Sequence, residues 1–502
     1  MKKRMSMALA MTLALGMSSY ALAENVATVN MSGGSGYTSI IQSGDADLDG
    51  VDQTVTVNQT GYDNSASADQ SGNNNTSAID QSGDYNGATT SQVGNSNQAS
   101  VLQLGSSSTA LVSQAGDNNQ GSVYQDLGEG SDAEITQSGL NNQGNVNQYG
   151  DSSTATISQL GDDNIASIDQ DTGPDNLASI EQTGNSNNGN IDQNGSGNTA
   201  SISQEGDYNN AANLQSGDDN VASIAQTGNG NNGDIDQNGS GNIASITQDG
   251  DDNYADIYQE GDSNTAAINQ IGTDNTSNEQ PLISQVGDSN NATINQEGVN
   301  HWAMINQTGD GNTAQIDQWA DNTYQWDAHI IQTGDYNWGH IDQSSADGDE
   351  RAYVTQTGYG NGAAVYQHGN YNDTYVDQTG NHSYAYVYQS GVNNYADIDQ
   401  TGDLHQAYVT QYGTDNNADI DQTGGWTDYA RVYQGSTSNN ADIDQTANGD
   451  YAYVCQHGGG FNLATVAQSG EYDSATIHQH GANDTATVTQ TGYGEYAYVY
   501  MD

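Results

Sequence analysis

The sequence predicts an all-β fold, a β-solenoid of stacked strand–turn–strand units in which two short strands make one coil, or rung, of about 22 residues. Three observations carry this prediction. Glutamine recurs every eleven residues, first at Gln59, Gln70, Gln81, Gln92, Gln103, Gln114 and Gln125. Small or branched apolar residues alternate with polar ones before each Gln, as on a strand whose side chains point to opposite faces. Between residues 385 and 445 the intervening residues switch from Tyr-rich to Asp-rich and back, so two strands form one larger unit.

The first 23 residues resemble a secretory signal peptide. Lys2, Lys3 and Arg4 precede an apolar run over residues 5–17, and small residues end at Ala23. We expect cleavage between Ala23 and Glu24, which places the mature chain outside the cytoplasm. No other run approaches the length of a membrane span. Residues 24–52 match the repeat poorly, and both an unstructured leader and an irregular N-terminal cap stay open.

The composition is strongly acidic. The chain has 64 acidic and five basic residues, a formal net charge of −59, and three of the basic residues lie in the signal segment. Nucleic acid and anionic membranes are poor partners for such a surface, because both need Lys and Arg clusters. A polar, acidic composition is typical of disorder, but the strict periodicity argues for a repeat fold.

The repeat unit occupies residues 53–502. A complete copy is given by Gln248, Gly250, Asn253, Ala255, Ile257 and Gln259. Asn, Ala, Ile and Gln share one parity, so we expect them to line the inner face of a strand. Gly in the four intervening residues suits a tight corner. Stacked in register, each Gln amide can hydrogen-bond to the next, as in amyloid-like cross-β structure. We expect this ladder at Gln389, Gln400, Gln411, Gln422, Gln434 and Gln445.

Departures from the pattern fall mostly in the connectors. Both prolines, Pro174 and Pro281, lie in lengthened connectors, where no strand hydrogen bond is lost. Trp326, Trp426 and Phe461 lie in connectors as well. Asn213 occupies an apolar position of the repeat and indicates a weakly packed rung.

An acidic face is expected on one sheet. Stacked carboxylates repel each other, and this arrangement invites a divalent cation such as Ca²⁺. A solvated face that only delays aggregation is the alternative that we favour. The carboxylates concerned are Asp397, Asp399, Asp419, Asp421, Asp442 and Asp444. No other cofactor is indicated.

A tyrosine face is expected on the opposite sheet. Exposed aromatic rows can bind carbohydrate or pack against another fibre, or they can only stabilise the stack. Arg431 interrupts the rows and is placed to stack on its neighbours. The tyrosines are Tyr386, Tyr388, Tyr408, Tyr433, Tyr453, Tyr498 and Tyr500.

Two further candidate sites have less support in the sequence. His457, His478 and His480 lie near the end of the chain at a spacing that permits a metal site, although surface histidines without a ligand are the favoured interpretation. Cys455 is the only cysteine, which excludes an intrachain disulfide. Its outward strand position predicts a free surface thiol or an intermolecular bridge.

Enzymatic motifs are lacking in the sequence. It contains no nucleophile elbow, phosphate loop or zinc-ligand spacing. A β-helical polysaccharide lyase is disfavoured, because a basic group for the substrate is barely available. We therefore expect a structural protein and not an enzyme.

The spacing Gln-x-Gly-x-x-Asn-x-Ala-x-x-x-Gln resembles the curlin repeat of bacterial curli fibres, in an unusually long member of that family. The resemblance implies an extracellular functional amyloid. It implies secretion through a dedicated outer-membrane pore, polymerisation on a nucleator at the cell surface, and roles in adhesion to host or matrix surfaces and in biofilm. The repeat continues to Met501, so its last strands are expected to offer an edge to another chain.

The expected function is thus a secreted subunit that polymerises into surface fibres of the fimbrium or pilus type. The alternative is a monomeric calcium- or ice-binding β-solenoid. Regular outward Thr rows favour ice binding, and Thr465, Thr476 and Thr487 give a short example.

Overall fold

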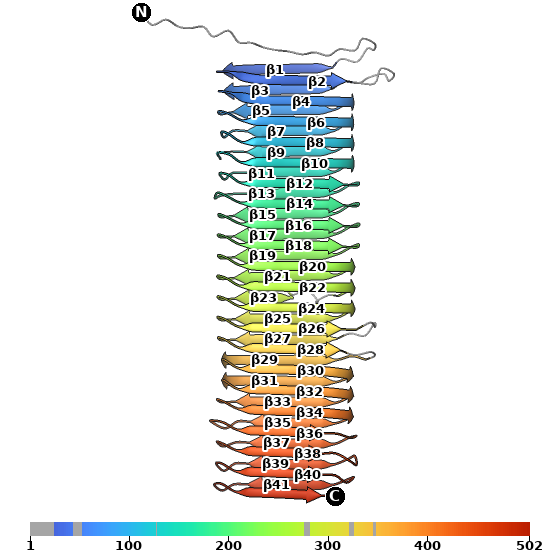
Figure 1. The fold of residues 1–502 in the computed structure, drawn as a ribbon, viewed down its shortest axis with the longest axis vertical. Helices are drawn as coiled ribbons and strands as arrows, with labels where there is room; N and C mark the ends of the chain where they lie inside the picture. Colours follow the sequence, from blue (N-terminus) through green and yellow to red (C-terminus); the bar gives the residue numbers. More distant parts are fainter. Residues whose placement is uncertain (1–24, 44–52, 127, 276–281, 321–325, 345–347) are drawn as a thin grey trace, which may run out of the picture. The chain divides into compact units, whose positions relative to one another are not determined.

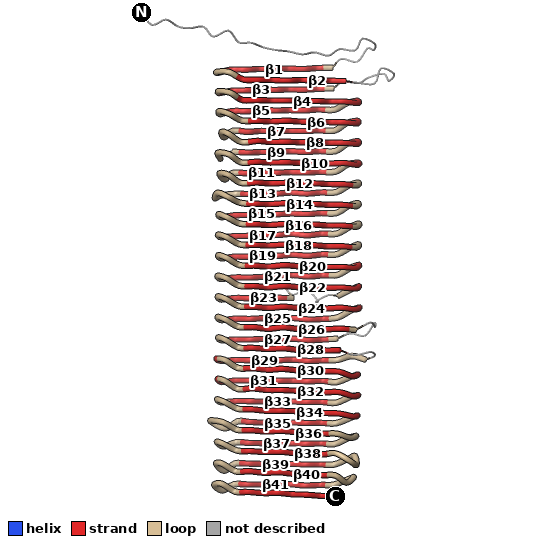
Figure 2. The backbone as a smooth tube through the Cα atoms, in the orientation of Figure 1, coloured by secondary structure: helices blue, strands red, loops and turns tan. Residues whose placement is uncertain are grey.

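The computed structural model describes residues 25–43, 53–126, 128–275, 282–320, 326–344 and 348–502. The predicted signal peptide and its cleavage site lie outside these residues, as does Pro281. The chain divides into two compact units, residues 1–241 and 242–502. Every regular element in the described residues is a β-strand (Figures 1 and 2). In this part of the chain no helix is long and apolar enough to cross a membrane.

Unit 1 (residues 1–241) consists of two parallel sheets. The odd-numbered sheet contains β1 (Val26–Gly33), β3 (Thr54–Gly61), β5 (Thr76–Ser82), β7 (Gln98–Gln103), β9 (Gln120–Gln125), β11 (Gln143–Gln148), β13 (Ile165–Gln170), β15 (Asn188–Asn194), β17 (Asn210–Ser216) and β19 (Asn232–Asn238). The even-numbered sheet contains β2 (Gly36–Ser43), β4 (Asn64–Asn73), β6 (Gly87–Asn95), β8 (Thr109–Asp117), β10 (Asp132–Leu140), β12 (Thr154–Leu160), β14 (Leu177–Thr183), β16 (Thr199–Glu205) and β18 (Val221–Thr227).

Unit 2 (residues 242–502) repeats this arrangement. Its even-numbered sheet contains β20 (Ile243–Asp251), β22 (Thr265–Thr273), β24 (Asn291–Val299), β26 (Thr313–Trp319), β28 (Trp338–Ser344), β30 (Gly362–Asn370), β32 (Tyr384–Val392), β34 (Gln406–Thr414), β36 (Tyr429–Gln434), β38 (Tyr451–Gln456), β40 (Ser474–Gln479) and β42 (Tyr496–Met501). Its odd-numbered sheet contains β21 (Tyr254–Glu260), β23 (Ile283–Val286), β25 (Trp302–Thr308), β27 (Asp327–Thr333), β29 (Arg351–Tyr359), β31 (Asp373–Asn381), β33 (Tyr395–Thr401), β35 (Asn417–Gln422), β37 (Asn440–Gln445), β39 (Leu463–Gln468) and β41 (Thr485–Gln490).

The register places like residues over like residues. In β16 and β18, for example, Ala200, Ile202 and Gln204 pair with Ala222, Ile224 and Gln226. These inward side chains are buried, and each buried Ile contributes about 1.5–3 kcal/mol of hydrophobic stabilisation. The predicted fold class, a β-solenoid with two strands per rung, is confirmed in each unit.

Glycine at the corners is required by the close approach of successive rungs. Gly184 has a φ of 119°, and a Cβ built on it would lie 2.0 Å from the carbonyl oxygen of Gly206 in the next rung. Any other residue there would collide with backbone. Pro174 lies in such a corner, between β13 and β14, in agreement with its predicted place.

The N-terminal segment contributes strands to the stack. β1 pairs in register with β3, and β2 pairs with β4. Most side chains of β1 are exposed, in contrast to the alternating burial of β3. The described part of residues 24–52 therefore forms an irregular first rung.

Two of the residues that depart from the repeat pattern lie inside the core. Asn213 is buried in the isoleucine column between Ile191 and Ile235, and its Nδ2 donates to the Ser201 carbonyl oxygen at 3.0 Å. Trp326 is fully buried, although the sequence placed it in a connector, and its Nε1 donates to the Gly348 carbonyl oxygen at 2.9 Å. Trp326 occupies a corner position that Asn holds in most rungs.

Candidate functional surfaces and ladders

The glutamine ladder runs through the interior of unit 2. On the even sheet, Nε2 of Gln389 donates to Oε1 of Gln411 at 2.9 Å, and Gln411 donates to Gln434 at 2.8 Å. On the odd sheet, Gln400 donates to Gln422 and Gln422 to Gln445, both at 2.8 Å. Each amide also reaches a backbone carbonyl oxygen of the opposite sheet. Gln411, for example, donates to the Tyr395 oxygen at 2.8 Å.

The repeat copy predicted around residue 250 takes part in the same network. Gln248 donates to Gln270 at 2.9 Å, and Gln259 donates to Gln285 at 2.8 Å. Ala255 and Ile257 are buried beside them. Nδ2 of Asn253 donates to the Gly272 carbonyl oxygen at 3.0 Å.

That last bond belongs to a second ladder, which the sequence did not reveal. In most rungs the residue that opens a strand is a buried Asn whose side chain donates to a corner carbonyl oxygen of the next rung. We call the column that opens the even strands the corner column. Within it, Nδ2 of Asn198 donates to Gly217 oxygen at 2.7 Å, and Oγ of Ser131 donates to Gly150 oxygen at 2.8 Å. Each Asn oxygen in turn accepts the backbone N–H of the next member, as Asn198 does from Asn220 at 3.0 Å.

The corner column changes composition near the end of unit 2. After Asn361 the successive members are Ser383, His405, Asp428, Asp450 and Asp473, and all of them are buried. His405 Nε2 lies 3.2 Å from the Gly424 carbonyl oxygen. The three aspartates thus stand where other rungs have a hydrogen-bond donor.

The acidic face lies on β33, β35 and β37. Asp419 pairs with Asp397 on one side and Asp442 on the other, while Asp421 pairs with Asp399 and Asp444. Partial burial, together with the neighbouring carboxylates, raises the pKa of Asp399 and of Asp419 to about 6. The same causes raise the pKa of Asp421 and Asp442.

Among the described residues, no group of three or more His, Cys, Asp or Glu side chains is arranged to hold a metal ion. Calcium binding by the acidic face stays a prediction. Its raised carboxylate pKa values make protonation at mildly acidic pH a second way to relieve the repulsion.

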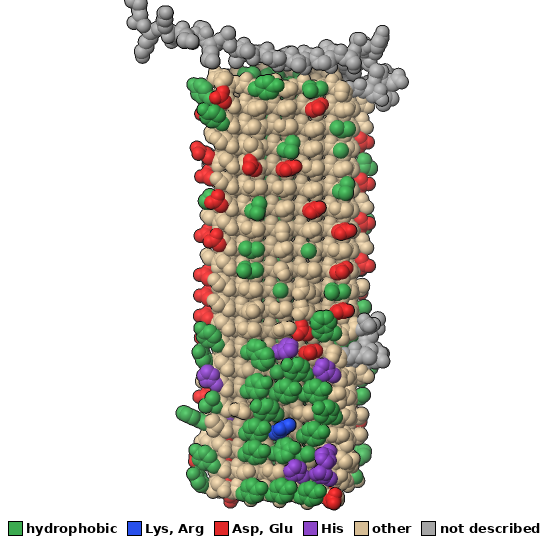
Figure 3. Space-filling view, viewed as in Figure 1, with side chains coloured by type: hydrophobic (Ala, Val, Ile, Leu, Met, Phe, Trp, Pro, Cys, Tyr) green, Lys and Arg blue, Asp and Glu red, His purple; other side chains and the backbone are tan. Residues whose placement is uncertain are grey.

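The tyrosine face lies on the even sheet of unit 2 (Figure 3). Tyr386 and Tyr408 are in register, with ring centroids 6.4 Å apart. Tyr429 and Tyr451 are stacked, with centroids 5.2 Å apart and ring planes 6° apart. Arg431 lies over the ring of Tyr453 at 5.9 Å, as its position in the sequence suggested. The remaining predicted tyrosines, Tyr388, Tyr433, Tyr498 and Tyr500, occupy outward positions of the same sheet.

The C-terminal histidines come together, a convergence that the sequence left open. The ring centroids of His457 and His480 are 3.9 Å apart, and those of His478 and His480 are 6.2 Å apart. Burial and the two other histidines lower the pKa of His478. These rings pack against Tyr433, Tyr453 and Tyr500, so they extend the tyrosine face.

Cys455 is not a surface thiol. It occupies an outward position, as predicted, but it is only 6% exposed. Its neighbours in the sheet are Tyr433 and His478, whose large side chains flank the small thiol. Burial raises the pKa of the Cys455 thiol.

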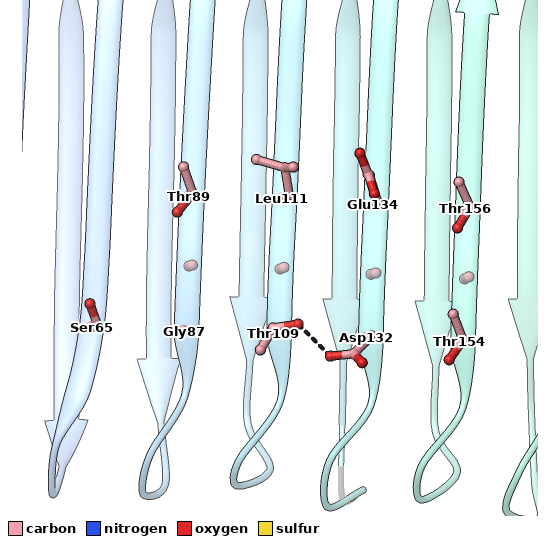
Figure 4. Close-up of a pocket in the computed structure, with 13 residues that line it drawn as sticks. Ser65, Gly87, Thr89, Thr109, Leu111, Asp132, Glu134, Thr154 and Thr156 are labelled. Atoms are coloured by element: carbon pink, nitrogen blue, oxygen red, sulfur yellow. Dashed lines mark hydrogen bonds between the residues drawn. The ribbon is translucent and has the colours of Figure 1, made fainter.

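A shallow concavity crosses the even sheet of unit 1. It is lined by outward side chains of β4 to β12, among them Thr89, Leu111, Glu134 and Thr156 (Figure 4). The hydroxyl of Thr109 hydrogen-bonds to Asp132 at its edge.

The threonines considered for ice binding do not form one row. Thr465 and Thr487 pair on the odd sheet, whereas Thr476 lies on the even sheet beside Tyr453 and Tyr498. An ice-binding face made by these three residues is therefore excluded.

Two stacked parallel sheets with internal amide ladders define a β-solenoid of structural repeats. Twelve segments of the chain match the model of the curlin associated repeat. The chain belongs to the curlin repeat family, as a long member with many repeats, and is a curli-like structural subunit. The segments are residues 50–83, 83–116, 105–139, 140–171, 173–206, 197–228, 217–250, 250–278, 283–318, 360–391, 391–424 and 462–492. A search of curated proteins found no match.

Proposed function

We propose that this chain is a secreted, non-enzymatic subunit that adds copy upon copy to an extracellular amyloid fibre, for adhesion and biofilm matrix. Membership of the curlin family supports the fibre and its location at the cell surface. The expected partners are other copies of the chain, a curli-type outer-membrane pore and a nucleator, with host or matrix surfaces as adhesion targets.

The observation that carries this proposal is the register. Each rung repeats the inward residues of its neighbour. A second copy that stacks on the last rung can therefore make the same hydrogen bonds as the rungs within one chain. In the described structure β41 pairs only with β39, and β42 pairs only with β40. Ala497, Val499 and Met501 of β42 are only partly buried, so the next rung would cover them.

The test uses the purified chain from residue 24 onward. We expect dye-binding fibres whose diffraction shows spacings of about 4.8 Å between strands and about 10 Å between sheets. Assembly is followed with Ca²⁺, with chelator, and at pH 5 and 7.5. A chain that remains monomeric in every condition contradicts the proposal, and one that binds Ca²⁺ as a stable monomer supports the calcium-binding alternative.

A further inference from the structure

The tyrosine face of unit 2 is free of carboxylates, in a chain that has 64 of them. Over β30, β32, β34, β36, β38, β40 and β42 the outward strand positions hold no Asp or Glu. They hold tyrosines, Arg431 and histidines instead. The odd strands of the same part of unit 2 show the opposite chemistry. Their aspartates are Asp373, Asp377, Asp397, Asp399, Asp419, Asp421, Asp442 and Asp444 on β31 to β37.

We propose that the tyrosine face of one copy docks on the acidic face of a second copy, side by side. Charge complementarity favours this occupant, since Arg431 would meet aspartates and the tyrosine face carries no carboxylate that would repel them. The phenol hydroxyls supply donors to carboxylates, a bond that the chain already makes between Tyr395 and Asp397 at 2.9 Å and between Tyr124 and Asp126 at 2.9 Å. Because the two faces differ, the contact is heterologous and extends without closing.

The size of the faces sets the strength of this contact. Seven strands at about 4.8 Å spacing, each about 17 Å long, give a flat face of roughly 570 Å². This is smaller than the roughly 800 Å² per partner of a stable interface. One contact is therefore weak, and lateral bundling follows once many copies are aligned in a fibre. The inference thus builds on the proposed fibre.

The experiment separates bundling from elongation. The variant Tyr386→Glu, Tyr408→Glu, Tyr453→Glu places carboxylates on the tyrosine face, and Ser201→Glu, Ser223→Glu places them on the even sheet of unit 1 as a control. We expect the tyrosine variant to elongate from seeds at the normal rate but to give thin, separate fibres in electron micrographs. Fibre bundles at least several-fold wider are expected for the native chain and the control.

Unchanged bundle width in the tyrosine variant overturns the lateral contact. If that variant also loses binding to an insoluble polysaccharide, the face is assigned to carbohydrate instead. Failure of elongation itself would instead count against the fibre. Replacing Asp397, Asp419 and Asp442 with Asn should reduce bundling as the tyrosine variant does.

A second inference comes from the corner column. Asp450 and Asp473 are each 1% exposed, and their Oδ2 atoms have no hydrogen-bond partner among the described residues. Their Oδ1 atoms accept the backbone N–H groups of Asp473 and Glu495, at 2.9 and 2.7 Å. Oδ2 therefore stands where Asn carries its NH₂ group.

That position faces another acceptor. A Cβ built on Gly470 would lie 1.6 Å from the Gly492 carbonyl oxygen and 2.6 Å from Asp473 Oδ2, so these two oxygens share one small space. Two oxygens without a proton between them repel, and a buried charge without a partner is costly. Asp428 differs in its surroundings, because its Oδ2 lies 3.3 Å from Nδ1 of His405.

We propose that Asp450 is protonated in the closed fold and donates to a corner carbonyl oxygen, as Asn does elsewhere. The last rungs of unit 2 then close in mild acid and loosen as pH rises. The charged groups around Asp450 are Asp428, Asp473 and Glu471, and all are acidic, so none compensates a charge on Asp450. Burial raises the pKa of Asp450 to about 6, in the same direction.

Hydrogen exchange at pH 5 and 7.5, corrected for the intrinsic rate, tests this. We expect the amides of β38, β40 and β42 to lose at least tenfold protection at pH 7.5, and the variant Asp450→Asn to keep it at both values. The reverse change, Asn198→Asp, should create the same pH dependence around β16. Equal protection of the native chain at both pH values overturns the inference, and so does protection restored at pH 7.5 by Ca²⁺ alone, which would indicate a cation site.

Discussion

At the residue scale, the buried amides are the groups whose loss is most costly. Gln422 both donates to Gln445 and accepts from Gln400, so its removal leaves two buried polar partners unsatisfied. Each such group costs about 1–3 kcal/mol. The same argument holds for every rung, which explains why Gln is the most regular residue in the sequence.

The variant Gln400→Ala, Gln422→Ala, Gln445→Ala tests the amide ladder. We expect it to lower the free energy of unfolding by about 3 kcal/mol or more and to slow seeded assembly, measured by denaturant unfolding and dye kinetics. Thr401→Ala, at an exposed position of β33, is the control. Unchanged kinetics in the triple variant would mean that the shape and packing of Ile suffice.

The acidic face predicts a pH effect on stability. The folded pKa of Asp399 and Asp419 is raised to about 6 from 3.8, so the folded chain binds protons more tightly than the unfolded chain. Stability from these groups therefore increases as pH falls through 6 and decreases as pH rises. His301 opposes this, because burial lowers its pKa to about 4.

A comparison of the native chain with a double variant isolates the effect of these carboxylates on stability. The native chain should gain more in melting temperature between pH 7.5 and pH 5 than Asp399→Asn, Asp419→Asn does, as scanning calorimetry can measure. His301 is present in both proteins and cancels from the difference. An equal gain in both proteins would show that these carboxylates do not contribute.

At the scale of the element, the sequence predicted strands and inward positions well. Ala, Ile and Gln repeat with a fixed parity, and parity alone decides which face a strand residue occupies. The corner column was missed, since the donation of Asn198 to Gly217 joins two rungs and leaves no local signal. The burial of Cys455 was not predicted for a similar reason, because the side chains that flank it come from the neighbouring strands β36 and β40.

The corners give a matched pair of glycine substitutions. Gly184→Ala meets both a positive φ and the Gly206 backbone, so we expect a loss of more than about 2 kcal/mol in unfolding free energy. Gly189→Ala, on β15, places Ala where Ala166 and Ala211 stand in the neighbouring rungs. Its Cβ would meet only side-chain atoms, Cγ2 of Ile180 at 3.0 Å and Nε2 of Gln182 at 3.3 Å, so we expect a smaller loss, of about 1 kcal/mol. Similar losses for both variants would contradict this account of the corners.

At the scale of the whole molecule, the two sheets of unit 2 carry different chemistry on one repeated backbone. The inward ladders are suited to growth by addition of rungs, whereas the outward faces are suited to contact between neighbours. The sequence predicted both faces from the Tyr and Asp alternation. It could not predict how the histidines join the tyrosines, because His457 and His480 lie at corners whose path the repeat does not fix.

The central claim, growth by continuation of the register from copy to copy, can be measured with single-cysteine variants mixed before assembly. In a Cys455→Ser background, Thr28→Cys lies on β1 and Thr487→Cys on β41, at outward positions that a stacked copy would place side by side. The account predicts disulfide-linked dimers of the two different variants in oxidised fibres, and none in the unassembled mixture. Fibres that form without this mixed dimer would contradict it.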